Sequence, residues 1–107
     1  MSIECFLADA AIEALAACHE LRHANLTWCV QLSDAALIAL AMGCPKLELL
    51  SVHGLQRITD ASIEALADEC SACLHTLDIN GCLGIKHYDR DALKTAFPLL
   101  QCFLYHK

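Results

Sequence analysis

The stretch that decides the fold is DAALIALA at Asp34–Ala41, which occurs again as DASIEALA at Asp60–Ala67 and, earlier, as DAAIEALA at Asp9–Ala16. A cysteine follows each copy, and the three cysteines are spaced 26 residues apart: Cys18, Cys44 and Cys70. Self-similarity at a fixed period of this length is typical of repeat architectures. We therefore interpret residues 1–107 as a single domain of about three repeats followed by a C-terminal closing segment.

Behind each of these cysteines comes a leucine pattern that ends in an alternation of apolar and polar residues. Its apolar positions are Leu21, Ala24 and Leu26, then Leu47, Leu50 and Val52, and finally Leu74, Leu77 and Ile79. Three residues further along the chain stand Cys29, Leu55 and Cys82. Alternation at period two predicts a short strand with one buried face in every repeat.

The alanine-rich stretches have the pattern of amphipathic helices. Apolar residues recur at the spacing of one helical face, at Leu37, Leu40 and Ala41 and again at Ile63, Leu66 and Ala67. Either Ser33 or Asp34, and either Thr59 or Asp60, can supply the oxygen acceptor that caps such a helix at its N-terminus. One strand and one helix in 26 residues cannot form a core alone, so we expect neighbouring copies to bury one another.

The combined pattern, from Cys44 and Leu47 through Ile58-Thr59-Asp60 to Leu66-Ala67 and Cys70, resembles the cysteine-containing leucine-rich repeat. This repeat is best known from F-box/LRR proteins, the substrate receptors of cullin-based ubiquitin ligases, and also occurs in related proteins without an F-box. The resemblance runs from about Ile3 to the end of the chain. It implies an α/β leucine-rich-repeat solenoid, a right-handed superhelix with parallel strands on the concave face and helices on the convex face.

The two ends of the array differ. A helix is expected at Asp91–Ala96, followed by Phe97-Pro98 and a final strand over residues 100–105 with Leu100, Phe103 and Tyr105 inward. This ending resembles the C-terminal closing segment of F-box/LRR proteins. At the other end the chain starts in the middle of a repeat, and no polar cap precedes Ile12 and Leu15. These two residues are expected to form an open apolar edge, as in a fragment of a longer array or a subunit of a complex.

Composition narrows the classes of partner. The net charge of −6 argues against nucleic acid and against anionic membranes, because both attract clustered lysine and arginine. No apolar run approaches the roughly 18 residues of a membrane span, and the first ten residues do not resemble a signal peptide. The eight cysteines fall mostly at repeat positions, so we interpret them as buried thiols in a reducing compartment, the cytoplasm or alternatively the nucleus.

A zinc site and a cysteine–histidine nucleophile are two alternatives to a structural role for the cysteines and histidines. Cys70, Cys73, His75 and Cys82 have some zinc character, but the repeat already explains Cys70 and Cys82 as core residues. The six histidines also suggest a cysteine–histidine nucleophile, because His23 and His53 are expected to lie near Cys29 and Leu55. A regular ladder of strands offers neither a base within reach nor an oxyanion site. We therefore expect no metal, no cofactor and no enzymatic activity.

The outward positions of the strands are the candidate binding residues. Trp28 can act as an exposed anchor or can simply cover the corner between strand and loop, whereas an outward apolar Leu49 has no core to enter. The predicted protein-binding set on the concave face is His23, Asn25, Thr27, Trp28, Leu49, Ser51, His53, Thr76, Asp78 and Asn80.

These features together predict a protein–protein interaction module with one or more protein partners. The resemblance implies the substrate-recognition repeats of an F-box/LRR ubiquitin-ligase receptor. The alternative is a structural subunit of a larger multiprotein assembly, ciliary for example, without a link to ubiquitin. What lies upstream in the gene would separate the two, since an F-box there favours the ligase.

Overall fold

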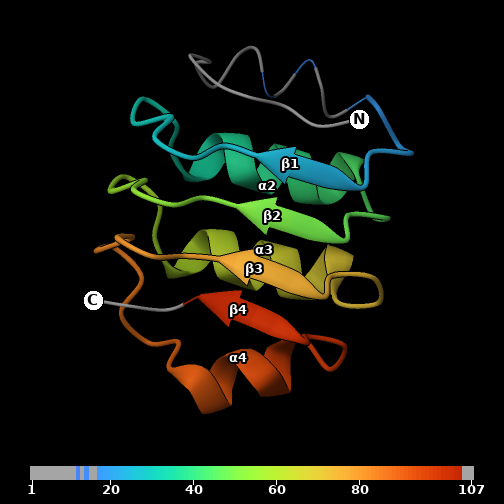
Figure 1. Ribbon diagram of the computed structural model, residues 1–107. Helices are drawn as coiled ribbons and strands as arrows, with labels where there is room; N and C mark the ends of the chain where they lie inside the picture. Colours follow the sequence, from blue (N-terminus) through green and yellow to red (C-terminus); the bar gives the residue numbers. More distant parts are fainter. Residues whose placement is uncertain (1–11, 13, 15–16, 105–107) are drawn as a thin grey trace.

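The computed structural model describes residues 12, 14 and 17–104, with residues 102–104 described by their backbone alone. In these residues strands and helices alternate along the chain (Figure 1). The order is β1 (His23–Asn25), α2 (Asp34–Gly43), β2 (Leu49–Ser51), α3 (Asp60–Cys70), β3 (Thr76–Asp78), α4 (Arg90–Ala96) and β4 (Cys102–Leu104). Most of the copy at Asp9–Ala16 lies outside the described residues.

The four strands form one parallel sheet in the order β1-β2-β3-β4. Parallel neighbours need a crossover connection, and helices α2, α3 and α4 supply the three crossovers. The register places Ala24, Leu50 and Leu77 side by side across the sheet, and all three are completely buried. Figure 1 shows α2 and α3 behind the strands, on the same face of the sheet. The core therefore lies between the sheet and these two helices.

The helical stripes predicted from the sequence face this core. Leu37, Leu40 and Ala41 of α2 are completely buried, as is Ile63 of α3, while Leu66 is 1% exposed. The predicted apolar faces are thereby confirmed, except that Ala67 is half-buried and packs at the margin of the core.

The helix ends follow the predicted capping in part. The Thr59 hydroxyl accepts a hydrogen bond from the backbone of Ala61 at 3.3 Å, as the sequence predicts for α3. Ser33, in the equivalent position before α2, makes no such side-chain cap bond. Helix α4 begins at Arg90 rather than Asp91, because the Asp89 side chain accepts from the backbone of Ala92 at 2.8 Å.

The chain closes as expected on a final strand, but a shorter one. Phe97 is completely buried and Leu100 is half-buried against the core. The strand predicted over residues 100–105 is observed at Cys102–Leu104, paired with β3. The side chains of Phe103 and Tyr105, which were expected to point inward, lie outside the described part of the chain.

The expected solenoid is wrong. The radius of gyration is 12.0 Å and the principal extents are 33 × 25 × 19 Å, close to the roughly 13 Å radius of a compact globular domain of this length. Strands spaced about 4.8 Å apart make a four-stranded sheet only about 14 Å wide. Curvature accumulates over many units, so these few strands form a small compact α/β globule and not a sheet curled into a superhelix.

The structure describes one of the two residues of the predicted open edge at the N-terminus. Ile12 is completely buried and belongs to the hydrophobic core, so its side chain is not exposed at an uncovered end. Leu15, the other residue of the predicted edge, lies outside the described residues.

Candidate functional site

The predicted binding residues lie on the face of the sheet that α2 and α3 leave uncovered, called here the open strand face. Their backbone positions align in three rows across the strands, because the repeat length matches the strand register. His23 is exposed, and the other strand residues in the predicted set are half-buried. The three rows are His23, Leu49 and Thr76; Asn25, Ser51 and Asp78; and, just beyond the strands, Thr27, His53 and Asn80.

Hydrogen bonds fix the polar side chains where β1 and β2 end. The backbone N–H and the hydroxyl of Thr27 both donate to Asn25 Oδ1, at 3.1 and 2.6 Å. The same Thr27 hydroxyl lies 2.7 Å from the hydroxyl of Ser51 on the neighbouring strand. An asparagine that accepts from the residue two further on holds a tight Asx turn, so these groups are oriented before any partner arrives.

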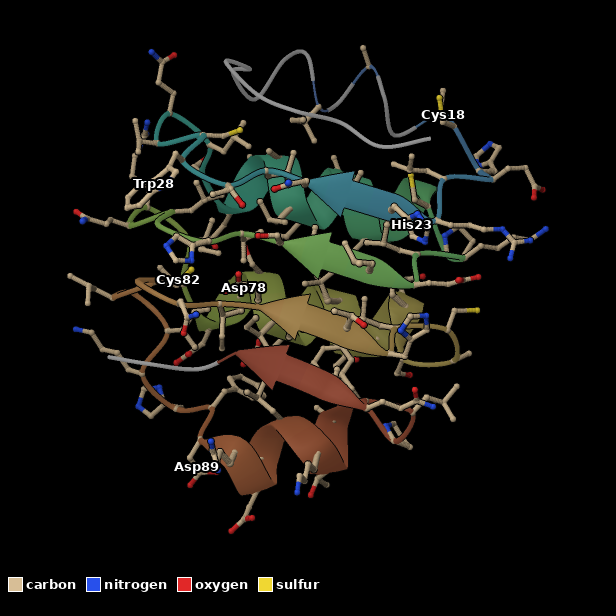
Figure 2. The ribbon with its side chains drawn as sticks, viewed as in Figure 1. Cys18, His23, Trp28, Asp78, Cys82 and Asp89 are labelled. Carbon is tan, nitrogen blue, oxygen red and sulfur yellow. The ribbon has the colours of Figure 1, made fainter. Side chains whose placement is uncertain are left out.

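A second set of contacts joins Trp28, His53 and Asp78. The rings of Trp28 and His53 meet edge to face, with centroids 5.1 Å apart and planes at 67°. His53 Nδ1 lies 3.6 Å from Asp78 Oδ2. Figure 2 labels Trp28 beyond the end of β1 and Asp78 on β3. The Trp28 ring thus packs against a neighbouring side chain, while the residue as a whole is 63% exposed.

Sequence reasoning missed a row of charged side chains at the starts of the strands. Arg22 donates to Glu48 Oε2 at 2.7 Å, and His75 Nε2 lies 3.6 Å from Glu48 Oε1. The hydrogen bond from Arg22 lowers the pKa of Glu48. His75 Nδ1 also lies 2.9 Å from the Thr76 hydroxyl. The signal was present, because Arg22, Glu48 and His75 occupy the same position in successive repeats.

The buried cysteines bind backbone carbonyls of the preceding repeat. Cys44 Sγ donates to the carbonyl of Cys18 at 3.3 Å, and Cys70 Sγ donates to that of Cys44 at 3.5 Å. Cys82 Sγ donates to the carbonyl of Val52 at 3.0 Å. Burial raises the pKa of Cys70 to about 12 and that of Cys82 to about 11. These thiols therefore stay protonated and act as small core residues with a donor.

The cysteines also bear on the zinc alternative and on the compartment. Within the described residues, no group of three or more histidine, cysteine or carboxylate side chains is arranged to hold a metal ion. The expectation of buried thiols that form no disulfide is confirmed at Cys70 and Cys82. It is wrong at Cys29, which is disulfide-bonded. Because disulfides form mainly in oxidising surroundings, Cys29 does not support a reducing compartment, and the compartment stays a prediction.

None of the helices in the described part of the chain is long and apolar enough to cross a membrane. No known protein-family model matches the chain. Among solved structures it is similar to a chain in the crystal structure of the Rad7 and Elc1 complex in yeast, with a TM-score of 0.74 and 21% sequence identity. The similarity covers 99% of this chain but only 29% of that chain, so the present chain spans less than a third of its neighbour's length. At this identity the likeness shows the fold alone.

Proposed function

We propose that this chain is a protein-binding module that holds its partner on the open strand face. The observation that carries the proposal is the alignment of its outward side chains into rows that run across neighbouring strands, together with Trp28, which follows β1 and is 63% exposed. Aromatic residues beside fixed polar groups are typical of the residues that dominate binding energy at protein interfaces.

The structural comparison supports a role in a multiprotein assembly. The similar chain was crystallised as part of a complex of two proteins, Rad7 and Elc1. We further propose that the repeats are of the cysteine-containing leucine-rich type and that the module recognises substrates for a ubiquitin ligase, as the resemblance to F-box/LRR proteins implies. What supports this finer proposal is the match of the repeat pattern, including cysteines that bind the preceding repeat.

The experiment is a binding assay with one disruptive change on each face. Leu49→Glu places a charge on the open strand face at the start of β2, and Met42→Glu makes the same kind of change at a side chain of α2 that is 66% exposed. Partners would be captured by crosslinking to wild-type chain in a cell extract and identified by mass spectrometry. We expect Leu49→Glu to abolish capture of a specific partner and Met42→Glu to preserve it. Equal capture by both variants would contradict the proposal.

The structural-subunit alternative is distinguished from the ligase proposal by which proteins are captured and by how removal of the chain changes their stability. A ligase receptor brings a Skp-type adaptor, and removing the receptor lengthens the half-life of its bound partner. A structural subunit instead purifies in a stable complex without such an adaptor, and its partners lose stability when it is removed. Copurification with a stable complex that lacks the adaptor would overturn the ligase proposal.

We also propose that the chain is not an enzyme. What supports this is that the buried thiols are committed to backbone carbonyls and have raised pKa values, which suppresses the thiolate that a cysteine nucleophile needs. Neither a cofactor nor a metal is part of the proposal, and the proposed compartment is the cytoplasm, with the nucleus as the alternative.

A further inference from the structure

The backbone of Trp28 adopts a conformation that residues other than glycine avoid. Its φ is 62°, and the equivalent positions in the next two repeats are Gly54, with a φ of 79°, and Gly81, with a φ of 76°. The turn itself therefore favours glycine, and tryptophan is held there against its backbone preference. An outlier of this kind, at an exposed aromatic residue, points to a function of the side chain.

The Trp28 ring is supported on one side and free on the other. A Cβ atom added at Gly54 would lie 2.5 Å from Trp28 Cε3, so the ring lies directly over that glycine. His53 meets the ring edge to face. With 63% of the residue exposed, a pre-oriented aromatic surface is left open to a partner.

Hydrogen-bond acceptors with unused capacity lie beside this surface. Asp78 Oδ1 accepts from the backbone of Asn80 at 3.0 Å, whereas Asp78 Oδ2 lies 3.6 Å from His53, beyond the length of a hydrogen bond. Within the described residues, no lysine or arginine forms an ion pair with Asp78. The buried Asn80 Oδ1 has no hydrogen-bond partner at all. Buried acceptors normally find a donor, so this site is chemically incomplete.

We propose that Trp28, His53 and Asp78 form a subsite for an arginine side chain of the protein partner. The inference rests on the proposed protein-binding function and names the chemistry that the open strand face recognises. A guanidinium group is planar and carries five donors, so it can stack on an aromatic ring while donating to a carboxylate. Two arginines of the chain already have other partners, Arg22 with Glu48 and Arg57 with the carbonyl of Gln31 at 3.1 Å.

The test uses a capped octapeptide of alternating glycine and arginine and the matched peptide with citrulline in place of arginine. Citrulline keeps the shape of the side chain and removes its charge. Trp28 is the single tryptophan of the chain, so its fluorescence reports binding directly. We expect saturable binding of the arginine peptide and about tenfold weaker binding of the citrulline peptide, the loss expected for one charge-assisted hydrogen-bonded pair.

Variants of the chain distinguish the subsite from general attraction to an acidic protein. Asp78→Asn keeps an oxygen for the Asn80 backbone and should weaken arginine-peptide binding about tenfold. Asp91→Asn removes the same charge from an exposed position on α4 and should leave binding unchanged. Trp28→Gly, followed by NMR shifts of the Asp78 and Asn80 amides, should also weaken binding, because the stacking surface is lost.

Three results would overturn the subsite: equal binding of the two peptides, equal effects of Asp78→Asn and Asp91→Asn, or no binding at about 10 mM peptide, a concentration at which even a millimolar complex is mostly formed. The proposed protein-binding function is tested independently of the arginine subsite. If Leu49→Glu abolishes capture of the natural partner while arginine peptides are ignored, the module stands and the subsite is wrong. If arginine peptides bind through Asp78 but no partner depends on Leu49, the subsite stands and the broader binding face is wrong.

Discussion

At the scale of single residues, Trp28 tests whether side-chain contacts offset an unfavourable backbone. A left-handed conformation costs a non-glycine residue roughly 1–2 kcal/mol. Trp28→Gly removes this cost together with the contact to His53, so we expect its unfolding free energy to stay within about 1 kcal/mol of wild type. Trp28→Ala keeps the backbone cost and should be about 1 kcal/mol less stable than Trp28→Gly. Urea denaturation of the two variants measures the difference.

Val30 provides the control for this pair. It is 55% exposed in the same loop, and Trp28 is the one non-glycine residue with a positive φ in the described part of the chain. At Val30 the order should reverse, with alanine more stable than glycine by roughly 0.5 kcal/mol. The same order at both positions would contradict the strain assigned to Trp28.

Cys70 should make stability depend on pH in the alkaline range. Burial raises its pKa in the folded chain from 9.0 to about 12, so the folded state holds the thiol proton more tightly than the unfolded state. This stabilisation is fully present below pH 9 and is lost as the pH rises toward 12, by at most about 1.4 kcal/mol per pH unit. Cys70→Ala, which loses hydrogen bonds and packing, should be about 1 kcal/mol less stable at pH 8.

The measurement is urea unfolding of wild type and Cys70→Ala at pH 8, 9 and 10 under the same reductant. Other alkaline titrations affect both proteins, so only the difference between them matters. We expect the advantage of wild type to shrink above pH 9. A difference that stays constant over the three pH values would show that the thiol does not remain protonated in the folded state.

The repeat spacing predicts the burial of the cysteines but not the backbone conformation of Trp28. The 26-residue spacing identifies Cys44 and Cys70 as core residues, because a position that recurs at the repeat length must meet the same environment in each copy. The same spacing aligns Trp28 with Gly54, but it carries no information on backbone φ at a position where only one copy is not glycine.

At the scale of elements, Asp34 joins the start of α2 to the start of α3. Its carboxylate accepts from the backbone and hydroxyl of Thr59, at 2.8 and 2.7 Å, and from the Ser62 hydroxyl at 2.5 Å. Ser62 is completely buried. Asp34→Ala leaves that hydroxyl and the Thr59 backbone unpaired, so we expect a loss of about 2–3 kcal/mol in unfolding free energy. Asp68→Asn, an exposed carboxylate on α3, should change stability by less than about 0.5 kcal/mol.

The Asp34 carboxylate should also make the stability of the folded chain depend on pH in the acid range. Burial of Asp34 opposes its ionisation, but the hydrogen bonds from Ser62 and Thr59 together outweigh burial and lower its pKa below 3.8. The stabilisation is therefore present above pH 3.8 and is lost as the pH falls through the lower pKa of the folded chain. Wild type should exceed Asp34→Asn in chemical-denaturation stability at pH 6, and the gap should narrow toward pH 2.5. A gap that widens in acid would reverse the assigned sign.

The sequence located the elements but did not reveal the role of Asp34. It offered Ser33 or Asp34 as the cap of α2, on local pattern alone. In the structure Asp34 instead binds Thr59 and Ser62, 25 and 28 residues further along the chain. The repeat explains this, because Asp60 makes the corresponding bonds to the backbones of Lys86 and His87. Local capping rules consider one helix at a time and cannot show a bond between copies.

At the scale of the whole molecule, the sequence predicts the pairing of strands and the placement of helices but not the overall shape. Parallel strands in sequence order follow from stacking equal repeats, and the structure confirms that order. Curvature depends on small rotations between copies and on their number, neither of which the apolar pattern encodes. With four short strands in its described part and an extent of 33 Å along its longest axis, the chain remains compact.

Compactness does not make the molecule uniformly stable. Helices α2 and α3 pack against each other and against the central strands, with several completely buried side chains in each helix. Helix α4 has seven residues, of which Leu93 alone is buried. Regions with few buried apolar contacts open at lower free energy than the core. The α4 amides should therefore exchange with solvent through local opening, while those of α3, β2 and β3 exchange through global unfolding.

Two matched truncations measured by native-state hydrogen exchange test this division. Leu66 in α3 and Leu93 in α4 are equally well buried, so Leu→Ala removes the same atoms at each site, at a cost of about 2–5 kcal/mol. Leu66→Ala should lower protection in α2, α3, β2 and β3 together, because it destabilises the global folded state. Leu93→Ala should lower protection chiefly in α4, since the opening that it promotes leaves the α2–α3 core intact. If both variants lower protection equally throughout the molecule, α4 is part of one cooperative unit and the division is wrong.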